Sequence, residues 1–106
     1  MGGPLFITGR RQSQALSRAQ IKAMATHSNV VGAITRITRE KREKRIVPDR
    51  PTWIELKRVL SSEEMTHLDL LVEVGAVKRW DSINYFSYEI NLGELTRYER
   101  SRFKSY

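Results

Sequence analysis

The segment from Ser61 to Asn91 constrains the fold of this chain more than any other part. It has the pattern of a short helix, a glycine stop and two β-strands joined by a polar turn. Ser61 and Glu64 have the spacing of a capping box, in which each side chain accepts a hydrogen bond from the other residue's backbone N–H. Gly75 suits the left-handed residue that ends a helix. The segment therefore predicts a capped helix followed by a β-hairpin.

A second capping box, Thr52 with Glu55, opens another short helix directly upstream. The apolar residues on one face of this helix are Trp53, Leu56, Val59 and Leu60. We expect Trp53 to belong to the core. Only two serines separate this helix from the next, so the two must cross at a steep angle.

The N-terminal half predicts two further helices. Ser17 and Gln20 form a third capping box, and Leu16, Ala19, Ala23 and Met24 share one face of the helix that follows. At His27-Ser28-Asn29 we expect the first helix to end and a second helix to begin with a new N-cap. From Val30 the apolar residues recur at helical spacing, and the helix continues through the charged run 39–45. It ends by Pro48, because the residue before a proline avoids helical geometry.

The predicted strands cover 76–80 and 85–90 and are rich in β-branched and aromatic residues. Phe86, Tyr88 and Ile90 fall on one face of the second strand, with Tyr85, Ser87 and Glu89 on the other. Trp80, Tyr85 and Phe86 are able to stack on bases, but hairpin aromatics that face inward usually belong to the core, and we expect this for Phe86 and Tyr88. A last helix follows, with Leu95, Tyr98 and Arg102 on one stripe.

These elements predict one domain with a basic arm. Residues 1–12 contain three glycines and Arg10-Arg11, and we expect a flexible basic arm there. Residues 13–106 are expected to form a single domain. Its parts are N-terminal helices in 13–47, two helices and a hairpin in 52–91, and a C-terminal helix in 93–106.

The charge is unevenly distributed. Residues 1–50 hold 11 Lys and Arg against 3 Asp and Glu, whereas residues 51–106 hold 8 against 9. A strongly basic half points to a polyanion, most often nucleic acid. The alternative is a solvated, highly soluble helix.

Residues Thr66 to Val77, THLDLLVEVGAV, and Asn84 to Ile90, NYFSYEI, resemble the winged-helix core of the ArsR and MarR repressors. Those groups have Ser/Thr-x-His-Leu-x-x-Leu-x-x-x-Gly-Leu-Val, a basic wing, then Tyr-x-Leu. The match covers roughly a third of the chain and is more specific for fold than for function. The resemblance implies a mainly α structure with a small β-hairpin (α+β), a winged helix-turn-helix with extra N- and C-terminal helices.

The recognition helix departs from that pattern because its outward face is acidic. By helical spacing this face presents Glu63, Glu64, Thr66, His67, Asp69, Leu70 and Glu73. Base readout normally uses Arg, Lys, Asn or Gln, and carboxylates held against phosphates repel them. The metal-sensing members of the resembling family use cysteine clusters, and this chain has no cysteine, so that property is not carried over.

The candidate nucleic-acid-binding residues are Arg10, Arg11, Arg36, Arg39, Lys41, Arg42, Thr66, His67, Lys78 and Arg79. Contacts from such cations to phosphates position a protein and carry little sequence information. The candidate partner-binding residues, under the alternative that the acidic helix docks on a protein, are Glu63, Glu64, Asp69 and Glu73.

Several classes of function lack support. His27 and His67 lie far apart in the sequence, without the spacing of a metal site, and no phosphate-binding glycine loop or nucleophile elbow occurs. We therefore expect neither an enzyme nor a metal or other cofactor. No apolar run approaches the ~20 residues that cross a bilayer, so we expect a cytoplasmic, nucleoid-associated protein without membrane contact.

Two functions of different classes follow. The first is a small transcriptional regulator of phage, plasmid or archaeal type that binds double-stranded DNA as a homodimer through its terminal helices. The second is a winged-helix interaction module that docks its acidic helix on a basic protein in a nucleic-acid-processing complex. A third reading is a basic structural protein of a ribonucleoprotein, with the run 39–45 threaded through RNA. The pattern and the net charge of +7 favour the first, and the acidic helix favours the second.

Overall fold

Four helices and one antiparallel hairpin make up the part of the chain that the structure, a computed structural model, describes: residues 16–103. The predicted arm and its Arg10 and Arg11 lie outside these residues. The elements are α2 (Arg18–Glu43), α3 (Trp53–Val59), α4 (Ser62–Glu73), β1 (Val77–Asp81), β2 (Phe86–Ile90) and α5 (Leu92–Phe103). The predicted class, mainly helical α+β with a small hairpin, is confirmed.

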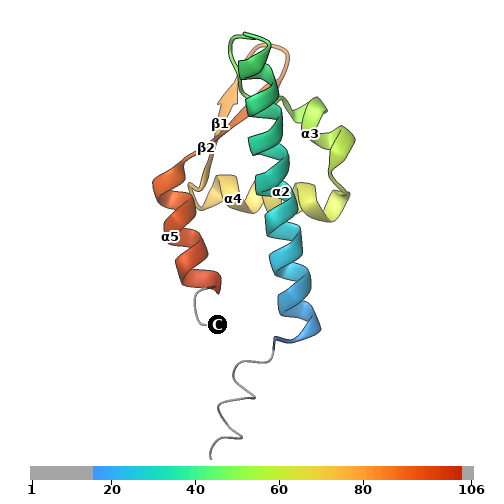
Figure 1. Cartoon of the computed structure of the whole chain (residues 1–106), viewed down its shortest axis with the longest axis vertical. Coiled ribbons are helices and arrows are strands. Elements are labelled where there is room, and N and C mark those ends of the chain that lie inside the picture. Colours follow the sequence, from blue (N-terminus) through green and yellow to red (C-terminus); the bar gives the residue numbers. More distant parts are fainter. Residues whose placement is uncertain (1–15, 104–106) are drawn as a thin grey trace, which may run out of the picture.

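Helix α2 is one continuous helix of 26 residues that runs along most of the described structure (Figure 1). The predicted break at His27-Ser28-Asn29 is wrong. These polar side chains make tertiary contacts instead of capping a new helix: the Asn29 amide donates to Glu64 Oε2 at 2.8 Å, and His27 is buried. The capping box at Ser17 is confirmed, with both of its hydrogen bonds to Gln20 formed.

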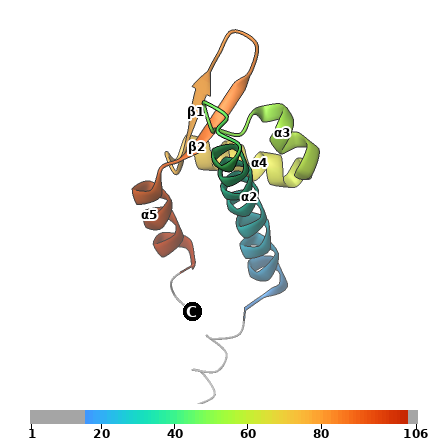
Figure 2. The ribbon, with the colours of Figure 1, turned by 45° about the horizontal axis from the view of Figure 1, so that its top comes forward.

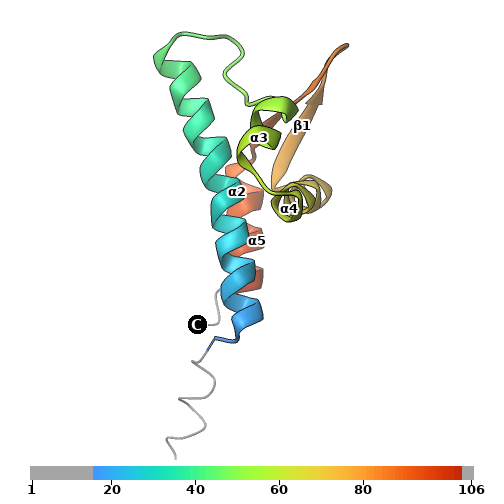
Figure 3. The same ribbon diagram turned by 90° about the vertical axis from the view of Figure 1, so that its right-hand side faces the viewer.

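The core forms where α3, α4 and the hairpin pack on one side of α2 (Figure 3). Helix α4 crosses α2 at a steep angle (Figure 1). The buried apolar residues are Val30, Ala33, Ile34 and Ile37 of α2, Leu56 and Leu60 around α3, Leu68 and Leu71 of α4, Ala76, Val77 and Tyr88 of the hairpin region, and Leu95 of α5. Burying each large side chain contributes about 1.5–3 kcal/mol.

Helix α3 buries only a narrow stripe. Its capping box, Thr52 with Glu55, is confirmed, and so is that of α4, Ser61 with Glu64. However, Trp53 is 37% exposed and Val59 is 50% exposed, so the prediction that Trp53 belongs to the core is wrong. A helix of seven residues has two turns, and here only Leu56 and the capping residue Leu60 reach the core.

The hairpin is packed at its base and projects beyond the helices at its tip (Figure 2). Gly75 has φ +86°, which confirms it as the left-handed residue after α4. The strands pair from Val77 opposite Ile90 to Asp81 opposite Phe86. Tyr88 is buried as predicted, whereas Phe86 is 39% exposed and the prediction for it is wrong. Phe86 lies beyond the reach of α4, because only the base of the hairpin meets that helix.

A short bridge ties β2 to the segment before α3. Thr52 pairs with Ser87, and the Tyr88 N–H donates to the Pro51 carbonyl at 3.0 Å. The hairpin is therefore held on both sides, by α4 and by the start of α3. Among the described residues, no helix combines the length and the apolar character needed to cross a membrane.

The two faces of α3 give a direct test of this packing. Leu56→Ala should lower the free energy of unfolding by about 2–5 kcal/mol, because it removes a fully buried side chain. Val59→Ala, on the same helix, should change it by less than about 0.5 kcal/mol, since that side chain is half exposed. Urea denaturation of both variants measures the difference. Equal losses would mean that α3 is packed in another orientation.

Candidate nucleic-acid interface

The C-terminal end of α2 presents a group of cations. Arg36 and Arg39 are exposed and have neither a hydrogen-bond nor an ion-pair partner within residues 16–103. Arg42 donates to Asp49 Oδ2 at 2.8 Å while its side chain stays 73% exposed. Lys44 and Arg45, which follow the helix, are also exposed. These five residues are termed the α2 basic end.

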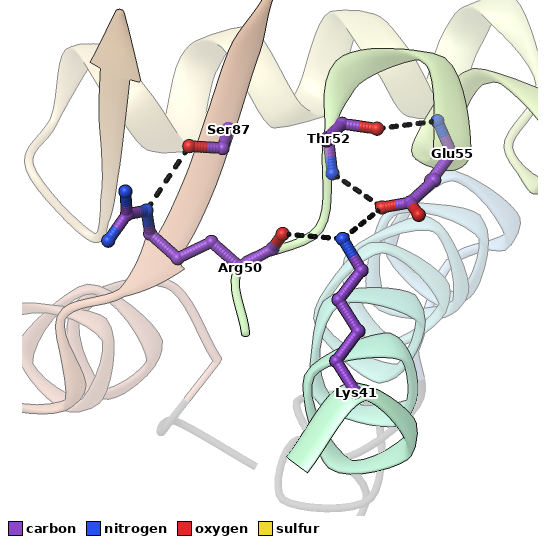
Figure 4. A network of polar contacts seen from close by, with 5 residues as sticks. All are labelled: Lys41, Arg50, Thr52, Glu55 and Ser87. Carbon is purple, nitrogen blue, oxygen red and sulfur yellow. Dashed lines mark hydrogen bonds and ion pairs between the residues drawn. The ribbon is translucent and has the colours of Figure 1, made fainter. Parts of the chain in front are cut away.

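Lys41 differs from its neighbours because its ammonium group is bound internally. Its Nζ lies 2.8 Å from Glu55 Oε1 and donates to the Arg50 carbonyl at 3.0 Å (Figure 4). Its side chain is only 14% exposed. Burial alone would raise the pKa of Glu55, but the hydrogen bonds from Lys41 and the Thr52 N–H lower it overall. Lys41 therefore joins α2 to α3, and its charge is not available to a phosphate.

Arg50 carries this connection to the hairpin. Its Nε donates to Ser87 Oγ at 3.1 Å, which gives the buried Ser87 a partner (Figure 4). Its guanidinium carbon lies 4.5 Å from the ring centroid of Trp80, and Lys78 Nζ lies 4.0 Å from the same centroid. The indole N–H of Trp80 donates to Glu89 Oε1 at 3.0 Å. Arg50, Lys78, Trp80 and Glu89 are termed the Trp80 cluster.

The sequence did not indicate Arg50 as a site residue, because it stands in a turn between two helices. Only the pairing of Thr52 with Ser87 brings it beside the hairpin. Thr52 and Ser87 are 35 positions apart, so no local sequence pattern indicates that they pair.

Lys78 and Arg79 point to opposite faces of the hairpin, since successive strand residues alternate. Lys78 contacts Trp80 on one face. On the other, the Arg79 guanidinium carbon lies 4.4 Å from the Phe86 ring centroid, and its Nε lies 3.3 Å from Asp81 Oδ1. The sequence grouped the two cations as one patch, whereas the structure divides them between two surfaces.

A groove of about 980 Å³ runs along the outward face of α4, between the first half of α2, α5 and the hairpin. Its carboxylates are Glu63, Asp69 and Glu73, and its cations are Lys22, Arg79 and Arg102. Lys22 Nζ lies 3.4 Å from Glu63 Oε2. The charges in the groove are therefore balanced, and this face does not favour a polyanion.

Two predicted residues of α4 are engaged locally. The Thr66 hydroxyl donates to the Ser62 carbonyl at 3.1 Å. Glu64 accepts from the Ser61 N–H and from Asn29, and these bonds, that of Ser61 first, lower its pKa. Asp69 and Glu73 have no hydrogen-bond or ion-pair partner within residues 16–103, so they are the carboxylates most accessible to a ligand.

His27 and His67, far apart in the sequence, meet in the structure. His27 Nδ1 lies 2.8 Å from His67 Nε2, and His27 Nε2 lies 2.7 Å from Glu99 Oε2. With Glu99 ionised, His27 Nε2–H donates to it, so the Nδ1 of neutral His27 accepts from His67 Nε2–H. Tyr98 and Phe103 pack against the His27 ring. This chain of three side chains joins α2, α4 and α5.

The histidine contact is consistent with a structural role for His67. In the part of the chain that the structure describes, no three His, Asp or Glu side chains are grouped to hold a metal ion. Burial, followed by the nearby His27 and Arg102, lowers the pKa of His67 below its usual value of 6.5. His67 is half-buried, and its Nε2 is already engaged with His27.

The lowered pKa of His67 predicts a pH dependence of stability. The unfolded chain takes up a proton at His67 near pH 6.5 while the folded chain does not, so stability falls as the pH decreases below 6.5. His67→Gln should remove this part of the dependence. Thermal unfolding of both proteins between neutral pH and the onset of carboxylate titration measures it. Parallel curves for the two proteins would exclude this role of His67.

Comparison of the chain with models of protein families, with curated proteins and with solved structures found no match.

Proposed function

We propose that this chain is a small DNA-binding transcriptional regulator of winged-helix type, in which the β1–β2 hairpin is the wing. The observation that carries the proposal is the position of the Trp80 cluster next to the α2 basic end. The Lys41–Arg50–Ser87 contacts join the two (Figure 4). Lys41 and Arg50 thereby hold the end of α2 beside the hairpin, so cations of two distant segments lie near one another.

The order of the elements supports the winged-helix assignment. Two helices cross at a tight corner, a hairpin follows, and residues before α3 add a bridge to β2. This order of elements is consistent with the winged helix that the sequence resemblance implies, in which α4 would take the position of the recognition helix.

The proposed contacts are mainly to phosphates. Arg36, Arg39, Arg42, Arg50 and Lys78 would each neutralise a phosphate of double-stranded DNA. With about five such contacts, affinity falls several-hundredfold between about 50 and 200 mM salt. Sequence preference then depends on the wing and on DNA shape, since α4 presents carboxylates.

The groove along α4 favours a second candidate function, docking on a protein. Asp69 and Glu73 are accessible there beside apolar side chains such as Leu70. A partner with a basic surface would complement these carboxylates. A second copy of the chain is one such partner, because its α5 carries Arg97, Arg100 and Arg102.

Two pairs of substitutions separate these functions. Lys78→Gln with Arg39→Gln should make the plot of log K for DNA binding against log salt concentration less steep. The slope should decrease by about 0.9 for each phosphate contact that is lost. Asp69→Asn with Glu73→Gln should leave that slope unchanged and weaken association with a protein or with a second copy. Neither pair removes a capping contact, unlike a change of Glu64. Binding to random-sequence duplexes over a salt series, followed by selection, measures the first effect, and sedimentation measures self-association.

A selected motif, above all a palindrome with half-sites about one helical turn apart, would establish a dimeric regulator. Absence of duplex binding at low salt would overturn the proposed function and leave protein docking as the better account.

Neighbouring cations on α2 provide an internal control. Arg39→Gln should weaken DNA binding without changing the free energy of unfolding, because the side chain is exposed and unpaired within the described residues. Lys41→Gln should do the reverse, lowering the free energy of unfolding by about 1–2 kcal/mol by leaving Glu55 without its cation. Filter binding and urea denaturation of each variant make the comparison. A larger loss of DNA binding in Lys41→Gln would contradict the assignment of Lys41.

A further inference from the structure

Exposed apolar side chains gather where α3 lies beside the hairpin tip. Ile83, at the tip, is fully exposed, and Ile54 is 51% exposed. Three aromatic residues complete the group: Trp53, Tyr85 and Phe86, each more than a third exposed. These five residues are termed the tip surface. Figure 3 shows α3 and the hairpin on the same side of α2.

The tip surface surrounds a hollow of about 490 Å³. The residues that line it are Trp53, Ile54, Ser82, Ile83, Asn84, Tyr85 and Phe86. None of them is a carboxylate, in contrast to the three that line the groove along α4. A bond from the Ser82 N–H to the Tyr85 carbonyl, 2.9 Å long, closes the turn and fixes the order of these side chains.

Two cations lie directly on the aromatic rings. Lys57 Nζ is 5.2 Å from the ring centroid of Trp53, and the Arg79 guanidinium carbon is 4.4 Å from that of Phe86. The nearest acid on the hairpin, Asp81, is already paired with Arg79. Beside the aromatic rings of the tip surface, Lys57 therefore keeps an uncompensated charge among the described residues, whereas the charge of Arg79 is matched by Asp81.

We infer that the tip surface binds unpaired nucleobases of a single-stranded nucleic acid, through the juxtaposition of its three aromatic rings with Lys57 and Arg79. Successive bases stack on aromatic side chains in sites of this composition, while cations contact the backbone. Arg79 also offers a planar guanidinium for stacking. The inference rests on the proposed function, because the cations of the α2 basic end must bring the strand to the hairpin.

The charge of the tip surface favours this occupant over an apolar peptide or a second copy. A polyanion complements Lys57, which has no ion-pair partner within residues 16–103, whereas an apolar partner would bury that cation without a counter-charge. Ser82 and Asn84 supply hydrogen-bonding groups within the hollow, which suits the polar edge of a base. An aliphatic partner would leave these groups unpaired.

The two tryptophans of the chain allow the contact to be observed directly. In Trp80→Phe, Trp53 is the remaining tryptophan, and its fluorescence should be quenched by an oligothymidine of about 12 nucleotides, within the usual site size. In Trp53→Phe, quenching should be weaker, because Trp80 lies outside the tip surface. Equal quenching in the two variants would overturn the inference.

A ring-removing variant and a ring-retaining variant separate stacking from general apolar contact. Tyr85→Leu with Phe86→Leu should weaken oligothymidine binding about tenfold or more, since each aromatic ring holds a base. Tyr85→Phe with Phe86→Tyr should bind as the unmodified chain does. Both variants should bind a blunt duplex unchanged, which also shows that they are folded.

The outcomes distinguish this inference from the proposed function. Duplex binding with no oligothymidine binding, or with oligothymidine binding that the Leu variant retains, would overturn the tip-surface inference alone. Self-association or binding to anionic vesicles that depends on Ile83, but not on the rings, would assign the surface to another partner and overturn it too. Loss of duplex and oligothymidine binding in every variant, and in the unmodified chain, would overturn the proposed function itself.

Discussion

The apolar stripe of α2 is the constraint on which the rest of the structure depends. Val30, Ile34 and Ile37 lie on one side of the helix, and α3, α4 and β2 all pack against that side. Each of these elements is too short to be stable alone, since isolated helices of this length are marginal and a two-stranded hairpin is weaker still. Their positions therefore follow from where α2 offers them a surface. The continuity of α2 through His27 matters for this reason, because a break there would divide the surface in two.

A chain of polar contacts from α2 to β2 fixes how the hairpin is oriented in this packing. The Lys41 ammonium holds both Glu55 and the Arg50 carbonyl, and Arg50 in turn holds Ser87 (Figure 4). Apolar contacts allow elements to slide, whereas hydrogen bonds to buried partners fix a register. The hairpin thus has a defined orientation relative to the cations of α2. Without this connection, the Trp80 cluster and the α2 basic end would be two independent charged groups on a small protein.

The sequence predicted the local features well and the tertiary ones less well. Capping boxes and Gly75 depend on residues within a few positions, so the pattern is complete in the sequence itself. Whether Trp53 and Phe86 are buried depends on how far α2 and α4 extend beside them. No local sequence pattern contains that information. The contact between His27 and His67 joins residues 40 positions apart, and nothing in the spacing indicated it. The predicted break at His27 failed for the same reason, because the polar residues that suggested it make their contacts across helices.

The distribution of charge distinguishes the end of α2 from the outward face of α4. Residues 36–45 at the end of α2 hold six Lys and Arg against two Glu, whereas β1 and β2 together hold two cations and two carboxylates, and the groove along α4 also has equal numbers of the two. A polyanion drawn to the first surface gains nothing from the second, and Asp69 and Glu73 would repel it. Under the proposed function, nucleic acid would lie at the end of α2 and the hairpin, while the face of α4 would stay accessible. An acidic α4 is compatible with that proposal, because α2 and the hairpin would supply the contacts to phosphates and α4 would be left for a protein partner.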